Sequence, residues 1–164
     1  MEIFVLRHGD ANSDSKKIID DSKRVLTDAG IKEVDGVSRF FGEFDIKLDH
    51  IFSSPLKRAK QTSEIILKNQ KKAKLTELME LKPEGIQDEV CKKITKQNAS
   101  TVLIVGHNPL LTDIINYVCS QKQIACNLSL KTGGLAKIKT ISVDPLKGQL
   151  EWLLTPKMIR KVSK

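Results

Sequence analysis

The sequence predicts an α/β protein: a three-layer sandwich with helices on both faces of a mostly parallel central sheet. Short apolar runs at 3–6, 50–53 and 101–105 have the length and composition of buried strands. Amphipathic segments with helical spacing lie between these runs. Strands that alternate with helices along a chain build parallel sheets covered on both sides.

The first strand and helix are expected near the start of the chain. Residues 3–6 form the first strand, and the polar stretch 9–26 predicts a loop with room for a short helix. Thr27 is the expected N-cap of the first long helix, with Asp28 in its first turn. The apolar residues of this helix recur at spacings of three and four, and they predict its buried face: Ile31, Val34, Val37 and Phe41.

The middle of the chain repeats the strand-then-helix pattern. After the strand at 50–53, Ser54 is the expected N-cap and Pro55 fits the first position of a helix that ends near Lys68. Residues 75–81 predict a third extended segment. The next helix is indicated by an apolar stripe of Ile86, Val90 and Ile94.

The last third of the chain begins with its clearest strand, 101–105, and Asn108-Pro109 predicts another capped helix start. The expected buried face of that helix is Leu111, Ile114, Ile115 and Val118. Alternating apolar and polar residues then predict strands at 135–143 and 149–154, joined by a turn near Asp144-Pro145. These two strands are expected to extend the sheet, at least partly antiparallel.

The length predicts a single domain over residues 1–164, with about 157–164 as a basic, loosely held tail. No apolar stretch approaches the roughly 20 residues that span a bilayer, and no secretory leader is recognisable. Cys91, Cys119 and Cys126 are odd in number and lack metal-ligand spacing, which is typical of free thiols in a reducing compartment. We therefore expect a cytoplasmic protein; the sequence leaves its oligomeric state open.

The net charge of +8 indicates an anionic partner. Phosphate-bearing ligands and nucleic acid are the two candidates. The lysines are scattered, and a single Trp and a single Tyr offer few stacking platforms, which disfavours nucleic acid.

Polar side chains follow three of the expected strands. Arg7 and His8 follow the first, Arg58 lies one turn inside the helix after the second, and His107 follows the strand at 101–105. Each feature alone has an ordinary structural explanation, such as a histidine that happens to start a loop. Because parallel strands share one carboxyl edge, however, these side chains are expected to converge there, beside helix N-termini that favour an anion.

This set of side chains suits phosphoryl transfer. Arginine forks match phosphate oxygens, and a neutral imidazole can attack phosphorus to form a covalent intermediate. In this scheme His8 is the nucleophile, Arg7 and Arg58 hold the phosphoryl oxygens, and His107 stabilises them when protonated. No acidic or His/Cys cluster indicates a metal site, so we expect no metal and no cofactor.

The motifs L-R-H-G, S-S-P-x-x-R-A-x-Q-T and G-H-N-P resemble the histidine phosphatase superfamily, which includes the cofactor-dependent phosphoglycerate mutases. The opening R-H-G-D-A, together with L-T-D-A-G and E-L-K-P, resembles its SixA-type phosphohistidine phosphatase branch. The resemblance covers about residues 2–155 and implies a phosphoglycerate mutase-like fold.

The resemblance also implies residue roles. It makes His8 the phosphorylated nucleophile and places Arg7, Arg58 and His107 in the phosphate pocket. Glu80 best matches the carboxylate that protonates the leaving group in many members, although it is equally compatible with a surface acid. Members that act on sugar phosphates often carry an asparagine where this chain has Asp14, and Asn12 or Thr132 are candidates to replace it.

The leaving group separates the candidate substrates. An alkoxide needs a general acid, whereas an imidazole leaves from phosphohistidine with less help because its conjugate acid has a pKa near neutrality. A phosphorylated protein carrying phosphohistidine is therefore the preferred substrate. Two alternatives stay open: a phosphatase or mutase for small phosphorylated metabolites, and a noncatalytic module that binds phosphate.

Overall fold

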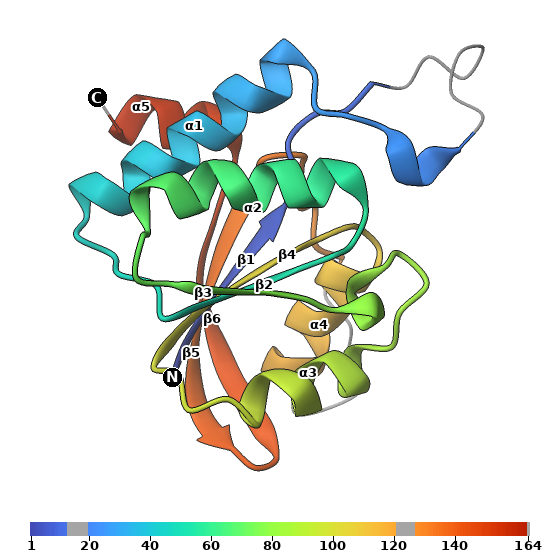
Figure 1. Ribbon diagram of the computed structural model, residues 1–164. Coiled ribbons are helices and arrows are strands. Elements are labelled where there is room, and N and C mark those ends of the chain that lie inside the picture. Colours follow the sequence, from blue (N-terminus) through green and yellow to red (C-terminus); the bar gives the residue numbers. More distant parts are fainter. Residues whose placement is uncertain (13–19, 121–126, 164) are drawn as a thin grey trace.

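A six-stranded mixed sheet runs through the centre of the computed structural model, which describes residues 1–12, 20–120 and 127–163 (Figure 1). The strands, in the order β3-β2-β4-β1-β5-β6, are β3 (Lys74–Glu77), β2 (His50–Ser53), β4 (Thr101–Gly106), β1 (Glu2–Arg7), β5 (Leu135–Val143) and β6 (Leu146–Leu154). The first four strands in this order are parallel to one another. β5 pairs antiparallel with β1, and β6 pairs antiparallel with β5. The predicted α/β class and mostly parallel sheet are confirmed.

Helices cover both faces of this sheet (Figure 1). One face carries α1 (Asp28–Glu43), α2 (Lys57–Asn69) and α5 (Pro156–Val162), and the other carries α3 (Gln87–Thr95) and α4 (Leu110–Cys119). Along β1, Phe4 and Leu6 pack toward the first group, while Ile3 and Val5 pack toward the second. Both sets are buried, which explains why the central strands are continuous apolar runs.

Only one of the three predicted helix caps forms. Thr27 accepts a hydrogen bond from the Gly30 N–H at 3.0 Å, as expected. The predictions for Ser54 and Asn108 are wrong, because α2 begins at Lys57 and α4 at Leu110, without side-chain caps. The two polar side chains have other partners: Ser54 Oγ contacts His107, and Asn108 donates to the Leu130 carbonyl.

The apolar spacing predicted most of the buried residues of α1 and α3, but it also included one residue near the start of each helix that is not buried. Val34, Val37 and Phe41 are fully buried, as are Val90 and Ile94. Ile31, in the first turn of α1, and Ile86, the N-cap residue of α3, are exposed instead. The extended segment predicted at 75–81 stops at Glu77 and is followed by the 3-10 turn η2 (Met79–Leu81).

The prediction of a loosely held C-terminal tail is wrong. Residues 156–162 form α5, which is capped by Thr155 and packs on α1. Ile159 is fully buried in the core on that face, and Ser163 Oγ donates to the Ile159 carbonyl at 2.7 Å. Buried Pro156 and Ile159 therefore hold in place a segment rich in basic residues.

The sequence also predicted that the chain has no membrane-spanning segment and that its cysteines are free thiols. Within the described residues, no helix combines the length and apolar character that crossing a membrane requires. Cys91 is a buried free thiol whose pKa is raised to about 12 by burial, and Cys126 lies outside the described residues.

Candidate active site

The three strand-to-helix junctions meet at the carboxyl edge of the sheet. Pairing of Arg7 with Gly106 and of Ser53 with Val105 brings the ends of β1, β4 and β2 level with one another. A cavity of about 330 Å³ opens there. Its lining includes five of the predicted site residues, namely Arg7, His8, Arg58, His107 and Thr132, together with Asp10, Ala11, Arg24, Pro83 and Asn108.

The hydrogen bonds of His8 fix which of its ring nitrogens is available. Nδ1 lies 2.8 Å from the Gly9 carbonyl oxygen, which only accepts, so Nδ1 carries the proton. Nε2 therefore keeps its lone pair, and Arg58 Nε donates to it at 3.2 Å. The ring is only 6% exposed. His8 is thus held as the neutral tautomer, with Nε2 as its nucleophilic atom.

The surroundings of His8 also keep it unprotonated. The pKa of His8 is lowered to about 4; burial is the largest cause, and the positive charges of Arg58 and Arg7 also contribute. The hydrogen bond to Gly9 acts in the opposite direction. At neutral pH the ring is therefore uncharged, although cations surround it.

His107 lies beside His8, with 4.9 Å between the ring centroids. Its Nε2 is 2.8 Å from Ser54 Oγ, and the ring is 2% exposed. Burial, followed by His8 and Arg58, lowers the pKa of His107 to about 3. The ring is therefore neutral at neutral pH, and a neighbouring phosphoryl dianion would be needed to favour the protonated form expected from the sequence.

The donors of Arg7 are only partly used. Its NH1 donates to the Leu130 carbonyl at 3.0 Å, while its buried Nε has no hydrogen-bond partner within the described part of the chain. Burial, and secondarily Arg58, lowers the pKa of Arg7. A phosphoryl oxygen is an acceptor of the kind that this donor lacks.

The loop before β5 holds the end of β1. Gly133 N–H lies within hydrogen-bond distance of both the Arg7 and His8 carbonyls, at 3.1 and 3.0 Å. Gly133 has a φ of 63°, and a Cβ there would approach Glu33 Cβ to 2.8 Å. Glycine is required for this close approach, and the loop places Thr132 in the cavity wall.

Asp21 and Arg24 belong to this site although the sequence did not indicate them. Arg24 lines the cavity, and Asp21 accepts from both terminal nitrogens of Arg58, through its carbonyl at 2.8 Å and its carboxylate at 3.0 Å. Both lie in or beside the 3-10 turn η1 (Asp21–Lys23), inside a stretch that predicted only a loop. The sequence offered one indication of this pair, which is that Asp21 and Arg24 are oppositely charged and three residues apart. That spacing is common on protein surfaces and does not by itself indicate a site.

Two other predicted residues, Glu80 and Asn12, are not brought to the cavity. Glu80 lies in η2, where Lys93 Nζ is 2.7 Å from its Oε1 and lowers the pKa of the carboxyl. Glu80 and Asn12 are absent from the cavity lining, although the Asn12 carbonyl accepts from Arg24 Nε at 2.6 Å. Asp14 lies outside the described residues.

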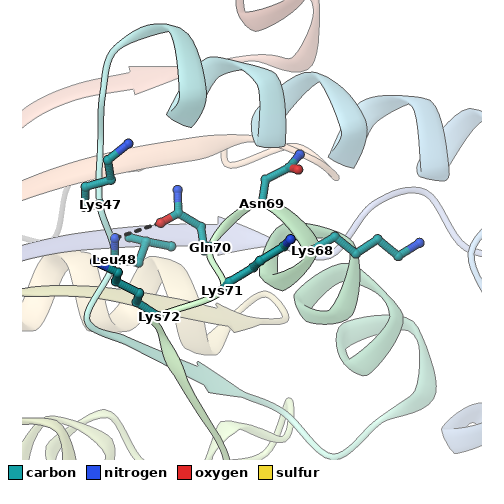
Figure 2. A pocket seen from close by; sticks show the side chains of 7 residues that line it. All are labelled: Lys47, Leu48, Lys68, Asn69, Gln70, Lys71 and Lys72. Atoms are coloured by element: carbon teal, nitrogen blue, oxygen red, sulfur yellow. Dashed lines mark hydrogen bonds between the residues drawn. The ribbon is translucent and has the colours of Figure 1, made fainter.

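A second hollow, of about 400 Å³, lies at the opposite, amino edge of the sheet (Figure 2). Lys47 and Leu48 precede β2, and residues 68–72 connect α2 to β3. Figure 2 shows the side chains of Lys47, Lys68 and Lys72 pointing in different directions. Gln70 accepts from the Leu48 N–H at 3.0 Å and so joins the two segments. This hollow is cationic, but its charges do not converge.

Comparison with known proteins gives the family and fold. A model of the histidine phosphatase superfamily, branch 1, matches residues 3–87, a segment that contains His8 and Arg58 and ends before His107. The phosphohistidine phosphatase SixA of Escherichia coli (strain K12) is 28% identical over 123 residues, which cover 73% of this chain and 74% of SixA. The fructose-2,6-bisphosphatase TIGAR of Xenopus tropicalis is 35% identical over 71 residues, 42% of this chain and 25% of that protein.

The fold is shared with a solved structure of the protein histidine phosphatase SixA complexed with tungstate. The TM-score is 0.83 at 24% sequence identity, and the superposition covers 96% of this chain and 98% of that one. The predicted phosphoglycerate mutase-like architecture is confirmed at this level.

Proposed function

This chain belongs to branch 1 of the histidine phosphatase superfamily, and we propose that it is a metal-independent phosphatase that forms a phosphohistidine intermediate on His8. One observation carries the proposal: a neutral His8, with its Nε2 lone pair available, lies in the wall of a cavity lined by arginines. Arginine charge would neutralise the phosphoryl oxygens, which is the main requirement of phosphoryl transfer.

In the first step His8 Nε2 attacks phosphorus, the new N–P bond forms, and the bond to the leaving group breaks. Arg58 Nε releases Nε2 at this point and becomes free to bind a phosphoryl oxygen. The ring is cationic while it carries the phosphoryl group. The Gly9 carbonyl, which accepts from Nδ1, stabilises that charge. In the second step water attacks phosphorus, inorganic phosphate leaves, and the ring returns to its neutral form.

The substrate proposed is a phosphohistidine side chain on another protein. Its imidazole leaving group needs little acid catalysis, because free histidine has a pKa of about 6.5. Glu80, the candidate general acid, is paired with Lys93 and is absent from the cavity lining. Similarity to SixA over most of both chains supports the same substrate class.

A second candidate is a phosphatase for small phosphorylated metabolites, which similarity to a fructose-2,6-bisphosphatase favours. An alkoxide leaving group would require Glu80 to leave Lys93 and donate a proton. Glu80→Gln separates the candidates. It should lower kcat severely for an ester substrate and change phosphohistidine hydrolysis by less than about threefold.

The test of the proposal is phosphate release from a matched substrate panel, with EDTA present throughout. The panel contains a phosphohistidine-carrying protein, a phosphoserine peptide, 3-phosphoglycerate and a sugar bisphosphate, and His8→Ala is the control. Fast release from phosphohistidine alone, lost in His8→Ala, is the expected result. A preference for a small ester would favour the second candidate, and release from none of the four would contradict both.

A further inference from the structure

A third arginine, which precedes the L-T-D-A-G motif and was not predicted from the sequence, reaches the cavity. Arg24 lines the cavity together with Arg7 and Arg58. Its charge also acts on His8: after burial, the cations that lower the pKa of His8 are Arg58, Arg7 and Arg24. Arg24 is therefore an electrostatic neighbour of the proposed nucleophile.

The position of Arg24 is fixed by hydrogen bonds on three nitrogens. Nε donates to the Asn12 carbonyl at 2.6 Å, NH2 donates to the Ala11 carbonyl at 3.2 Å, and NH1 donates to Asp21 Oδ1 at 3.0 Å. A guanidinium has five N–H groups, so each terminal nitrogen retains one N–H without an acceptor in the described part of the chain. A fixed planar fork with such donors is suited to an oxyanion.

Asp21 connects this arginine to Arg58. Its Oδ1 accepts from Arg24, and its Oδ2 accepts from Arg58 NH2 at 3.0 Å. The hydrogen bond from Arg24, and then that from Arg58, lowers the pKa of Asp21, so the carboxylate is ionised at neutral pH. Two guanidinium groups at the rim of one cavity repel each other, and the shared carboxylate offsets that repulsion.

We propose that Arg24 is a third oxyanion-binding arginine of the cavity, and that Asp21 is the positioning residue that holds Arg24 and Arg58 toward the phosphoryl group. This inference rests on the proposed function of the cavity and adds to it a binding group and the residue that orients it.

The experiment measures binding of inorganic phosphate and of tungstate by calorimetry, with kcat and KM for phosphohistidine hydrolysis as a second readout. The variants are Arg24→Ala, Arg24→Lys and Asp21→Asn. The matched control is Asp20→Asn, which makes the same charge change one residue away at an exposed carboxylate that caps η1. Thermal unfolding verifies that each variant is folded.

Arg24→Ala is expected to weaken binding of both anions about tenfold or more, because a hydrogen bond to a charged group is lost. Arg24→Lys keeps the charge but not the fork, and we expect a smaller loss of about threefold. Raised KM with kcat nearly unchanged in these two variants would further support a binding role. Unchanged anion affinity in a folded Arg24→Ala protein would overturn the assignment of Arg24.

Asp21→Asn gives the sharper test, because the two possible roles predict opposite signs. If Asp21 acted only as a competing negative charge, its removal would tighten anion binding. As a positioning residue, its loss is expected to weaken binding several-fold, while Asp20→Asn changes binding less than twofold. Tighter or unchanged binding in Asp21→Asn would overturn the positioning role. Since these affinities need no turnover, they are independent of whether His8→Ala abolishes activity, which tests the proposed function.

Discussion

The two hollows at opposite edges of the sheet are both cationic, but they are built differently. At the carboxyl edge, His8 and Arg58 are buried and each is bound to other parts of the site. At the amino edge, Lys68, Lys71 and Lys72 are exposed, and the labelled lysines diverge (Figure 2).

The difference between the two hollows is therefore one of fixed geometry and not of the sign of their charge. Fixing an exposed lysine on an anion costs about 2 kcal/mol of side-chain entropy, whereas a guanidinium already held by hydrogen bonds loses much less. The net charge of +8 therefore says little about function, and the few cations with fixed positions say more.

The largest expected loss of activity comes from removing His8, the proposed nucleophile of the carboxyl-edge cavity. His8→Ala should lower the rate of phosphate release on the order of 10⁴-fold, because the proposed covalent intermediate forms on His8. Stopped-flow or discontinuous phosphate assays measure the effect. His50→Ala, at a buried histidine bonded to Thr76 in the sheet, is the control and should retain most of the activity. Comparable loss in both variants would point to unfolding instead of chemistry.

Removing one cation from each hollow compares the two directly. Arg58→Ala should lower kcat/KM about 10²- to 10³-fold, the usual cost of losing a fixed donor that stabilises transition-state charge. Lys71→Ala should change it less than about twofold, since Lys71 is exposed and lies at the other edge of the sheet. Similar losses in the two variants would mean that overall charge, and not fixed geometry, drives activity.

The burial that makes His8 a neutral nucleophile also makes folding dependent on pH. Its folded pKa of about 4 lies below the unfolded value, so the unfolded state binds more protons between these values. Stability should therefore fall as the pH drops below about 6.5, by about 2 kcal/mol from His8 alone at pH 5. Urea denaturation of the wild type and of His8→Asn measures this term, and equal pH slopes in the two proteins would contradict it.

The smallest effect concerns two buried serines with different surroundings. Ser54→Ala removes the partner of His107 Nε2 and should cost about 1 to 2 kcal/mol of stability and about tenfold in activity. Ser63 is the matched control, because its buried hydroxyl has no partner within the described residues, and Ser63→Ala should be close to neutral. Chemical denaturation and phosphate release measure both variants. The account would fail here if Ser63→Ala were the more damaging change.

The part of the site that could be predicted follows from topology. Arg7, His8, Arg58 and His107 each lie at or just beyond the end of a parallel strand, and parallel strands must share an edge. Strand ends are marked in the sequence by the change from apolar to polar residues, and the expected convergence of three such ends, together with the family motifs, singled these four residues out.

What could not be predicted depends on contacts between distant segments. Asp21 and Arg24 enter the site because η1 packs against α2 and Asp21 binds Arg58, and Glu80 pairs with Lys93 of α3. Ser54 was predicted as a helix cap from its position before Pro55. Its actual partner, His107, is distant in the sequence, with Nε2 lying 2.8 Å from Ser54 Oγ. Such pairings are set by tertiary packing, which leaves no periodic signal in the sequence.

The most direct test of the central claim is to trap the intermediate. Rapid acid-free quenching of the enzyme with a phosphohistidine-carrying protein, followed by peptide mass spectrometry, measures which residue is phosphorylated and to what extent. The account predicts transient, acid-labile phosphate on the peptide containing His8, and none at this site in His8→Asn. Phosphate release without any label on His8, or stable label on a different residue, would contradict it.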